Sequence, residues 1–372
     1  MKKTLLIFHQ NLVMGGVEKV TLNLIKNIDK KKFNVKLILV EKQGELLQEI
    51  PKDIEVIYLL DKIYPAEPNI IVKIKRYITK KLYIIHKKLD ILIKKDDIIL
   101  NMNMRNMLLN ISLYPYRNKK IGWIHGNIMN DLDSVFNKIN YKFFGQYSVI
   151  LNVSVQGMDD FNRKFSKLKN KSKALYNSFD IDNLRKKAEL EEVKENNYLI
   201  SLGRLSKEKG FDILIDAMKL LRDEGFDEKL YIIGEGEERK NLENKINKYK
   251  LQNNIFLLGF KSNPYPILKN AKMCILSSLG EGLPTVLIEA LSCECPIVST
   301  NCKCGPNEIL ENGRYGILVH VGSAEELKTG IKKMILDENL RDNFRKKSLK
   351  RAYDFSNKRI LNELENIIES LQ

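Results

Sequence analysis

The stretch from Ser277 to Ala290, SSLGEGLPTVLIEA, carries the densest set of structural and chemical signals in the chain. It follows a short apolar run, Met273–Leu276, that predicts a buried strand, and it ends in a run that predicts the first turns of a buried helix. The small residues, glycines and proline between the two predict a turn. A turn that leads into a helix N-terminus exposes free backbone N–H groups, so it suits an anion such as a phosphate.

Two carboxylates, Glu281 and Glu289, bracket this turn. Glu289 lies inside an otherwise apolar helix pattern, where a carboxylate is costly unless it has a partner. Sugar hydroxyls are good partners, because a carboxylate accepts several hydrogen bonds. The alternative is that one glutamate faces solvent from the helix and the other from the loop.

The spacing of the two glutamates resembles the Glu-x7-Glu signature of retaining glycosyltransferases with the GT-B fold, in particular of family 4. The resemblance implies two doubly wound, Rossmann-like α/β domains that face each other across a cleft. It also implies that the second domain holds the nucleotide-sugar donor, with Glu281 at the sugar and Glu289 at the ribose hydroxyls. The other donor-binding residues that it implies in this turn are Gly282, Leu283, Pro284 and Thr285.

Two cations, Arg204 and Lys209, follow a predicted strand that ends at Gly203. They suit a diphosphate, because a guanidinium bridges oxygens and an ammonium acts as a point charge. Solvated surface cations are the alternative. The pattern Gly-Arg-Leu-x-x-x-Lys-Gly resembles the diphosphate clamp of the same family, which implies catalytic roles for both cations. Further donor contacts are expected from Gly203 and Gly234, and from Phe260 and Lys261 near the nucleobase.

The N-terminal half opens with a predicted strand, residues 3–8, a glycine pair and a helix, as doubly wound domains do. The motif Gly-Gly-Val-Glu, residues 15–18, resembles the first-domain loop of family 4 that faces the donor phosphates and sugar, which implies donor contacts from Gly15 and Gly16. His125 follows a second predicted strand and resembles the family's histidine near the reacting centre. The alternatives are a plain tight turn and a structurally satisfied histidine.

The length of 372 residues predicts two ordinary domains, and 44% hydrophobic with 30% charged residues is a soluble globular composition. We expect an N-terminal, acceptor-side domain over 1–185, a hinge over 186–197 and a donor-binding domain over 198–372. The final helix is free to cross back to the first domain.

The formal net charge is +16. A compositional bias toward lysine and attraction to an anionic membrane surface are both open explanations, whereas no nucleic-acid-binding module is recognisable. Residues 70–93 predict a basic amphipathic helix. Its cationic side chains, with Lys94 just beyond its end, are Lys73, Arg76, Lys80, Lys87 and Lys94.

The chain shows neither a signal peptide nor a run of about 20 apolar residues. The expected location is the cytoplasm, peripherally on the inner face of the cell membrane, where the five cysteines stay free thiols. Four of these form two Cys-x-Cys pairs, 293/295 and 302/304, that are spaced poorly for zinc. Asp131, Asp133, Asp180 and Asp182 are expected to be turn and helix-cap residues. We therefore expect no metal and no cofactor.

The resemblance implies transfer of a hexose, with a UDP-sugar as the expected donor, to a glycan or polyprenyl-linked acceptor in bacterial polysaccharide or glycoconjugate assembly. A GT-B sugar-nucleotide epimerase is one alternative, although it needs histidines and the chain has four. A non-catalytic, membrane-associated subunit is the other, although it would be expected to have lost the diphosphate clamp.

Overall fold

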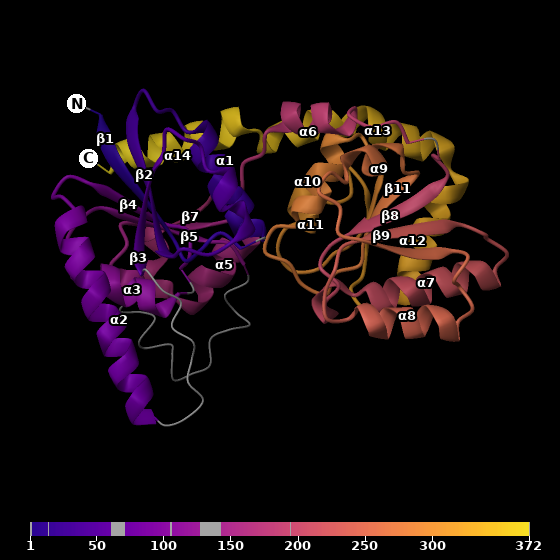
Figure 1. Cartoon of the computed structure of the whole chain (residues 1–372). Coiled ribbons are helices and arrows are strands. Elements are labelled where there is room, and N and C mark those ends of the chain that lie inside the picture. Colours follow the sequence, from indigo (N-terminus) through magenta and orange to yellow (C-terminus); the bar gives the residue numbers. More distant parts are fainter. Residues whose placement is uncertain are drawn as a thin grey trace. The chain divides into compact units, whose positions relative to one another are not determined.

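The computed structural model describes residues 2–13, 15–60, 71–104, 106–126, 143–193 and 195–371, with the side chains of α2 described from residue 81 onward. The chain forms two compact units. The first comprises Met1–Ser178 and Ile360–Gln372, and the second comprises Phe179–Arg359 (Figure 1).

The first unit is built on a seven-stranded parallel sheet of order β3-β2-β1-β4-β5-β6-β7. Its central strands are apolar runs buried on both faces, as parallel sheets require. The strands are β1 (Lys3–His9), β2 (Phe33–Glu41), β3 (Glu55–Leu60), β4 (Ile98–Asn101), β5 (Lys120–Ile124), β6 (Val149–Asn152) and β7 (Ser172–Ala174).

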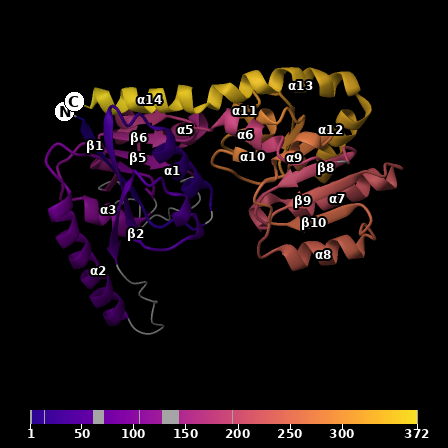
Figure 2. The same ribbon diagram turned by 45° about the horizontal axis from the view of Figure 1, so that its top comes forward.

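Helices cover both faces of this sheet. They are α1 (Gly16–Asn27), α2 (Ile71–Leu92), α3 (Met107–Leu113), α5 (Val155–Lys164) and, from the end of the chain, α14 (Asn357–Ser370). In Figures 1 and 2, α14 runs beside the first unit, where Glu365 accepts a hydrogen bond from the backbone of Asp29, just after α1. The predicted basic helix corresponds to α2, which packs Ile85 and Leu89 into the core.

The second unit has a six-stranded parallel sheet of order β10-β9-β8-β11-β12-β13. The strands are β8 (Tyr198–Leu202), β9 (Lys229–Ile233), β10 (Ile255–Gly259), β11 (Met273–Leu276), β12 (Ile297–Thr300) and β13 (Ile317–Val319). The helices are α6 (Ile181–Ala188), α7 (Phe211–Asp223), α8 (Arg239–Lys248), α9 (Tyr265–Asn270), α10 (Thr285–Ser292), α11 (Pro306–Ile309), α12 (Ala324–Leu336) and α13 (Glu338–Ala352). The apolar faces of α7, α8 and α12 form a core with the sheet.

Both sheets reverse their strand order once, between β1 and β4 in the first unit and between β8 and β11 in the second. Ligands of doubly wound sheets bind outside the carboxyl ends of the strands at this switch point. The prediction of two doubly wound α/β domains is thus confirmed. The topology predicts ligand sites in the loops that follow β1 and β4 and in those that follow β8 and β11.

The chain passes from the first unit to the second between Ser178 and Phe179, and it returns to the first between Arg359 and Ile360. The segment predicted as the hinge, 186–197, lies within the second unit, where it begins in the last residues of α6 and leads to the start of β8. Helix α14 begins in the second unit and continues in the first.

Candidate functional site

Two loops that are far apart in the sequence are joined at the switch point of the second unit. One follows β8 and carries Arg204 and Lys209, and the other follows β11 and opens the Ser277–Ala290 stretch. The backbone N–H of Leu279 donates to the Glu208 carbonyl (2.8 Å), and the Ser277 hydroxyl donates to the Lys209 carbonyl (2.8 Å). The two regions singled out by sequence therefore form one structure.

Lys209 and Glu281 form an ion pair across these loops, with 2.7 Å between Nζ and Oε1. Both side chains are largely buried, at 21% and 10% exposure. The Ser278 hydroxyl donates to the same carboxylate oxygen at 2.6 Å, and Ser278 is itself buried. Sequence analysis assigned no role to Ser278, because its hydrogen bond to Glu281 depends on the conformation of the folded loop.

Arg204 and two glycines line the same edge of the sheet. The Arg204 side chain is 69% exposed and lies 3.5 Å from Glu208, so it is free to reorient toward a ligand. Gly234 has φ of +147°, and a Cβ there would lie 1.9 Å from the carbonyl oxygen of Gly203. A residue with a side chain at 234 would push the two strand ends apart, which explains the glycine.

The turn before α10 is supported from behind by the segment that carries α11. Gly305 has φ of +106°, and a Cβ there would lie 2.3 Å from Pro284 Cδ. The buried Arg351 of α13 donates to the carbonyls of Glu308 (2.7 Å) and Ile309 (2.9 Å), which end α11. These contacts fix the predicted donor-binding turn, which comprises Gly282, Leu283, Pro284 and Thr285.

Glu289 lies on α10 among groups that burial keeps neutral. Burial, followed by the negative charge of Glu289, raises the pKa of Tyr265 and raises that of Cys293 to about 12. Phe260 and Lys261 follow β10, the edge strand, and both are exposed, Phe260 at 56%. They stand at the same carboxyl edge as Arg204, two strands further along the sheet.

In the first unit, the glycine pair begins α1, with Gly15 as its N-cap and Gly16 as its first residue. The Glu18 carboxylate folds back over this helix start, and a Cβ on Gly15 would lie 2.2 Å from its Oε2. Its other oxygen lies 3.8 Å from Nε2 of His9, the last residue of β1. Burial raises the pKa of Glu18 and lowers that of His9 to about 4, so His9 is neutral at pH 7.

His125 follows β5, as predicted, and its Nδ1 lies 3.1 Å from Oδ1 of Asn177. Burial, and next the proximity of His9, lowers the pKa of His125 to about 3. The imidazole is therefore neutral, and an acceptor oxygen at Nδ1 favours the tautomer that carries its proton on Nδ1. Nε2 is left with its lone pair, and it has no hydrogen-bond partner among the described residues.

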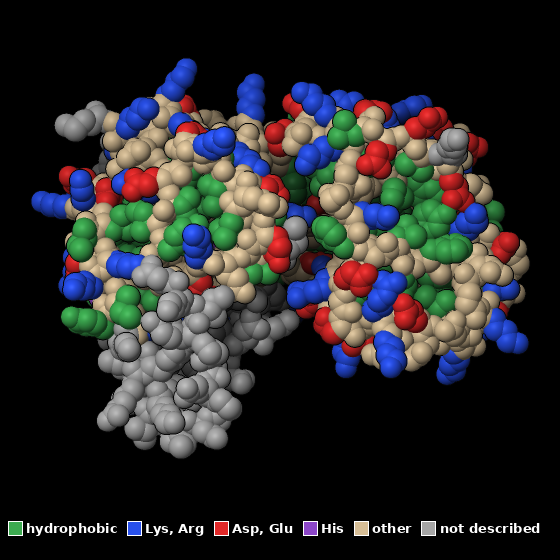
Figure 3. All heavy atoms as spheres, in the orientation of Figure 1, with side chains coloured by type: hydrophobic (Ala, Val, Ile, Leu, Met, Phe, Trp, Pro, Cys, Tyr) green, Lys and Arg blue, Asp and Glu red, His purple; other side chains and the backbone are tan. Residues whose placement is uncertain are grey.

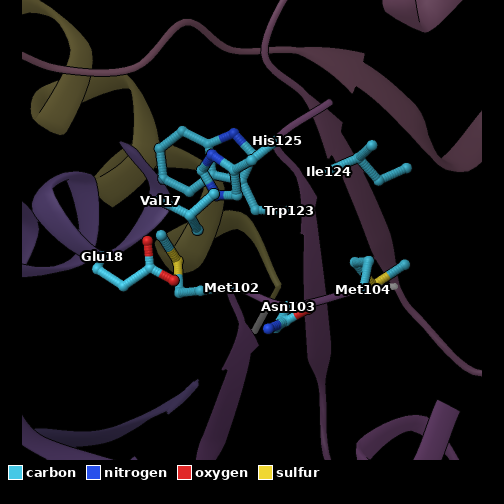
Figure 4. A pocket seen from close by; sticks show the side chains of 8 residues that line it. All are labelled: Val17, Glu18, Met102, Asn103, Met104, Trp123, Ile124 and His125. Atoms are coloured by element: carbon cyan, nitrogen blue, oxygen red, sulfur yellow. The ribbon is translucent and has the colours of Figure 1, made fainter. Parts of the chain in front are cut away.

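A cavity of about 110 Å³ lies beside His125, at the switch point of the first unit. It is lined by Val17 and Glu18 from α1, by Met102 and Asn103 after β4, and by Trp123 with His125 (Figure 4). The rings of Trp123 and His125 lie with centroids 5.1 Å apart. Sequence analysis missed Trp123, because its place beside α1 and the loop after β4 depends on the folded structure.

The described residues hold no cluster of three or more His, Cys, Asp or Glu side chains that could bind a metal ion. All five cysteines are buried free thiols, and burial raises the pKa of Cys302 to about 12. Asp180 caps α6, as predicted, by accepting from the backbone N–H of Asn183 at 3.1 Å. Asp182 accepts from the Tyr353 hydroxyl, and Asp131 and Asp133 lie outside the described residues.

The face of the molecule shown in Figure 3 carries its positive charge in dispersed form among its described residues. On the face shown in Figure 3, Lys and Arg side chains are interspersed with Asp and Glu. On α2, Asp90 accepts a hydrogen bond from the Tyr116 hydroxyl at 2.7 Å, whereas Lys87 is exposed to solvent. The side chains of Lys73, Arg76 and Lys80 lie outside the described residues. Among the residues that are described, no helix has the length and apolar character needed to cross a membrane.

Comparisons with known proteins agree with this architecture. Residues 182–351 match the family model described as glycosyl transferases group 1. An uncharacterized glycosyltransferase of Methanocaldococcus jannaschii, MJ1059, is 35% identical over 292 residues, which are 68% of this chain and 72% of the relative. A Campylobacter jejuni enzyme is 32% identical over 62% of this chain and 63% of its own length. That enzyme is named N-acetylgalactosamine-N,N'-diacetylbacillosaminyl-diphospho-undecaprenol 4-alpha-N-acetylgalactosaminyltransferase.

Solved structures resemble the whole chain. A glycosyltransferase of Rickettsia africae superposes with a TM-score of 0.80 at 20% identity, covering 99% of this chain and 98% of that one. Anabaena HepE in complex with UDP superposes with a TM-score of 0.76, also at 20% identity, covering 99% of this chain and 100% of that one. These matches identify the fold as GT-B, as predicted.

Proposed function

The chain belongs to the glycosyl transferases group 1 family, and from that premise we propose that it is a retaining, family 4 hexosyltransferase. Its donor is a nucleotide diphosphate sugar, with UDP as the favoured nucleotide, and its acceptor is a hydroxyl of a glycan or lipid-linked saccharide. Residues 198–372 bind the donor, and residues 1–185 serve the acceptor.

The ion pair between Lys209 and Glu281 carries this proposal. Lys209 is suited to bind a diphosphate for two reasons. It lies at a switch point, where a carboxylate orients its ammonium group, and the exposed guanidinium of Arg204 follows the same strand. When the diphosphate replaces Glu281 as the ion-pair partner of Lys209, the Glu281 carboxylate becomes available to accept hydrogen bonds from the donor sugar. Glu289 accepts the ribose hydroxyls, and the backbone N–H groups at the start of α10 face the phosphates.

In the proposed reaction, the bond from the anomeric carbon to the phosphate oxygen breaks while the acceptor oxygen bonds to that carbon. The acceptor proton passes to the departing diphosphate on the same face. Arg204 and Lys209 stabilise the charge that develops on the leaving group, as preorganised cations do. His125, Gly15 and Gly16 are further donor contacts in this scheme.

The names of similar proteins support the choice of substrates. HepE and TarM were crystallised with UDP, and the Campylobacter jejuni relative is named for an alpha-linked transfer to a diphospho-undecaprenol acceptor. A Staphylococcus aureus relative is named for capsular polysaccharide biosynthesis. We infer a role in the assembly of a polysaccharide or glycoconjugate.

A panel of UDP- and GDP-sugars, with release of the nucleoside diphosphate measured alongside the stereochemistry of the product, tests the proposal. We expect release from a UDP-hexose or UDP-N-acetylhexosamine and an alpha-linked product from an alpha-linked donor. An inverted product would overturn the retaining assignment. Release from no donor, with any acceptor or with water, would overturn the transferase itself.

A lipid-linked acceptor would place the chain at a membrane surface, and α2 is the element that we propose makes the contact. Its described surface presents Lys87, Tyr83 (69% exposed) and Ile91 (80% exposed), and Lys94 follows directly. Each lysine near an anionic surface contributes about 1 kcal/mol. K87Q/K94Q should therefore weaken sedimentation with phosphatidylserine-containing vesicles by more than tenfold. The control K346Q/K347Q removes the same charge from α13, and equal loss in both variants would mean that the location of the charge is immaterial.

A further inference from the structure

The buried side chain of Arg351 connects two parts of the second unit that are separate in the sequence. Its Nε and Nη2 donate to the carbonyls of Ile309 (2.9 Å) and Glu308 (2.7 Å), at the end of α11. Its Nη1 donates to the Asp354 carboxylate at 2.8 Å. Arg351 is only 9% exposed, and all three of its guanidinium nitrogens are thus paired, as a buried charge requires.

The first of these two parts supports the proposed donor-binding turn. The residues that lead into α11 contact that turn, because a Cβ on Gly305 would lie 2.3 Å from Pro284 Cδ. The backbone N–H of Glu281 also donates to the Lys303 carbonyl at 3.4 Å. Helix α13 packs directly on α10, the helix that carries Glu289. Displacement of α11 or α13 would therefore displace the groups that are proposed to bind the donor.

The second part is the linker between the two units. The chain passes between the units twice, just before Phe179 and just after Arg359. The segments beside these passages are joined by two backbone hydrogen bonds. The Phe179 N–H donates to the Phe355 carbonyl at 2.9 Å, and the Asn357 N–H donates to the Phe179 carbonyl at 2.8 Å. We refer to Phe179 and the segment Phe355–Asn357 as the linker contact.

The guanidinium of Arg351 lies against this linker contact. Its Cζ is 4.9 Å from the centroid of the Phe355 ring and 5.6 Å from that of the Tyr315 ring, and its carboxylate partner Asp354 directly precedes Phe355. A planar group with several donors can hold two carbonyls and a carboxylate while it stacks on an aromatic ring. A lysine ammonium would keep the charge and lose this geometry.

We propose that Arg351 is a positioning residue that couples the donor-binding turn to the linker contact. The inference rests on the proposed transferase function, which assigns the turn to a nucleotide. A nucleotide that orders the turn stabilises the linker contact through Arg351, and by linkage an intact linker contact strengthens nucleotide binding. The segments that join the two units thereby respond to the occupancy of the donor site.

Hydrogen exchange of backbone amides tests this coupling in the full chain. UDP and GDP are first titrated by calorimetry, and the tighter-binding nucleotide is then used at saturation. The amides of Phe179 and Asn357 should exchange at least about fivefold more slowly than in the free chain. Amides of α8, which packs on the opposite face of the sheet from α10 (Figure 1), are the internal reference for a general gain in stability.

The conservative variant R351K keeps the positive charge and removes the planar fork. It should abolish the nucleotide-dependent slowing and weaken nucleotide binding by about fivefold or more. The matched control R345K changes an exposed arginine of the same helix and should retain both values. A purely structural role predicts instead that R351K lowers the melting temperature while the folded chain keeps the slowing.

The variant D354N provides a second test that does not depend on the folding of R351K. It preserves the shape of the side chain, leaves both α11 carbonyls paired with Arg351 and removes the negative charge next to the linker contact. The nucleotide-dependent slowing should decrease to about twofold or less. The control D342N removes an exposed acid of α13 and should leave the slowing unchanged.

The outcomes distinguish this inference from the proposed function. Nucleotide binding without extra slowing at the linker contact, or equal slowing in the parent chain and in either variant, overturns the coupling. Turnover of a nucleotide sugar without the slowing overturns the coupling alone. Slowing in a chain that turns over no nucleotide sugar supports the coupling and refutes the transferase, whereas binding of neither nucleotide overturns both.

Discussion

At the switch point of the second unit, Lys209 and Glu281 pair at 2.7 Å with a serine hydroxyl on the same carboxylate. At the switch point of the first unit, His9 is buried and His125 is half-buried, both imidazoles are neutral, and neither Nε2 has a hydrogen-bond partner among the described residues. The same topology thus carries a close lysine–glutamate ion pair in one unit and two neutral imidazoles beside a half-buried carboxylate, Glu18, in the other. The difference teaches that topology selects the place of a site, whereas the local side chains determine which charges meet there.

The largest expected effect comes from removing the cations of the second switch point. R204A/K209A should lower turnover by at least about a thousandfold, because preorganised charges at a leaving group contribute on that scale. Initial rates with the best donor measure it, and K207A in the same loop is the control, since Lys207 is exposed. Turnover that survived in the double variant would break the assignment of this site to a diphosphate.

A smaller effect is expected from S278A, because Ser278 orients Glu281 without being expected to touch the phosphates. Losing a hydrogen bond to a carboxylate should weaken binding of the UDP-sugar about tenfold while leaving UDP affinity nearly constant. Calorimetric titration with both ligands measures this split. Equal losses for UDP and UDP-sugar would show that the serine supports the loop as a whole.

The first switch point makes its own prediction for acid stability. The pKa values of His9 and His125 in the folded chain, about 4 and about 3, lie below the ordinary histidine pKa of about 6.5, so the unfolded chain binds more protons below pH 6.5. The free energy of unfolding is therefore highest above pH 6.5. It falls as the pH decreases toward 5, by roughly 3 kcal/mol per pH unit for the two groups together.

Urea titrations at pH 7, 6 and 5 measure this slope. H320Q is the control, because the His320 side chain is 87% exposed and its loss should leave the slope unchanged. A flat profile between pH 7 and 5 would mean that the two imidazoles are solvated, which would remove the distinction between the two switch points.

The smallest expected effect is that of chelation. Arg204 and Lys209 supply the positive charge that the diphosphate needs, so EDTA should leave turnover within about twofold of the untreated rate. Activity that was lost with EDTA and restored by Mg²⁺ or Mn²⁺ would show that the cations of the second switch point are insufficient alone.

The architecture and one of the two sites were accessible from sequence, for a physical reason. Apolar runs and glycines are local patterns, so they predict the strands, the doubly wound sheets and the loops that carry Arg204, Lys209 and Glu281. The pairing of Lys209 with Glu281, and the role of Ser278, depend on packing between loops separated by about 70 residues in the chain. No local pattern encodes such a contact.

The cavity of the first unit could not be predicted from the sequence for the same reason, because three elements that are separate in the sequence line it. Trp123 resembles an ordinary strand residue, and Glu18 an ordinary residue of a first helical turn. They line one cavity only because β5 and α1 meet at one edge of the sheet. Orphaned hydrogen-bonding atoms are a property of the folded state, so sequence patterns do not reveal them.

Helix α14 has a consequence for the order in which the chain is made. Its buried side chains from Ile360 to Ile368 belong to the first unit, whose sheet is synthesised before any of the second unit. The unit begun first is thus the one finished last, and the ribosome must translate the entire second unit before the first can close its apolar surface. A nascent chain stalled before residue 360 would hold a nearly complete second unit beside an unfinished first one, which makes the first unit the expected client of chaperones.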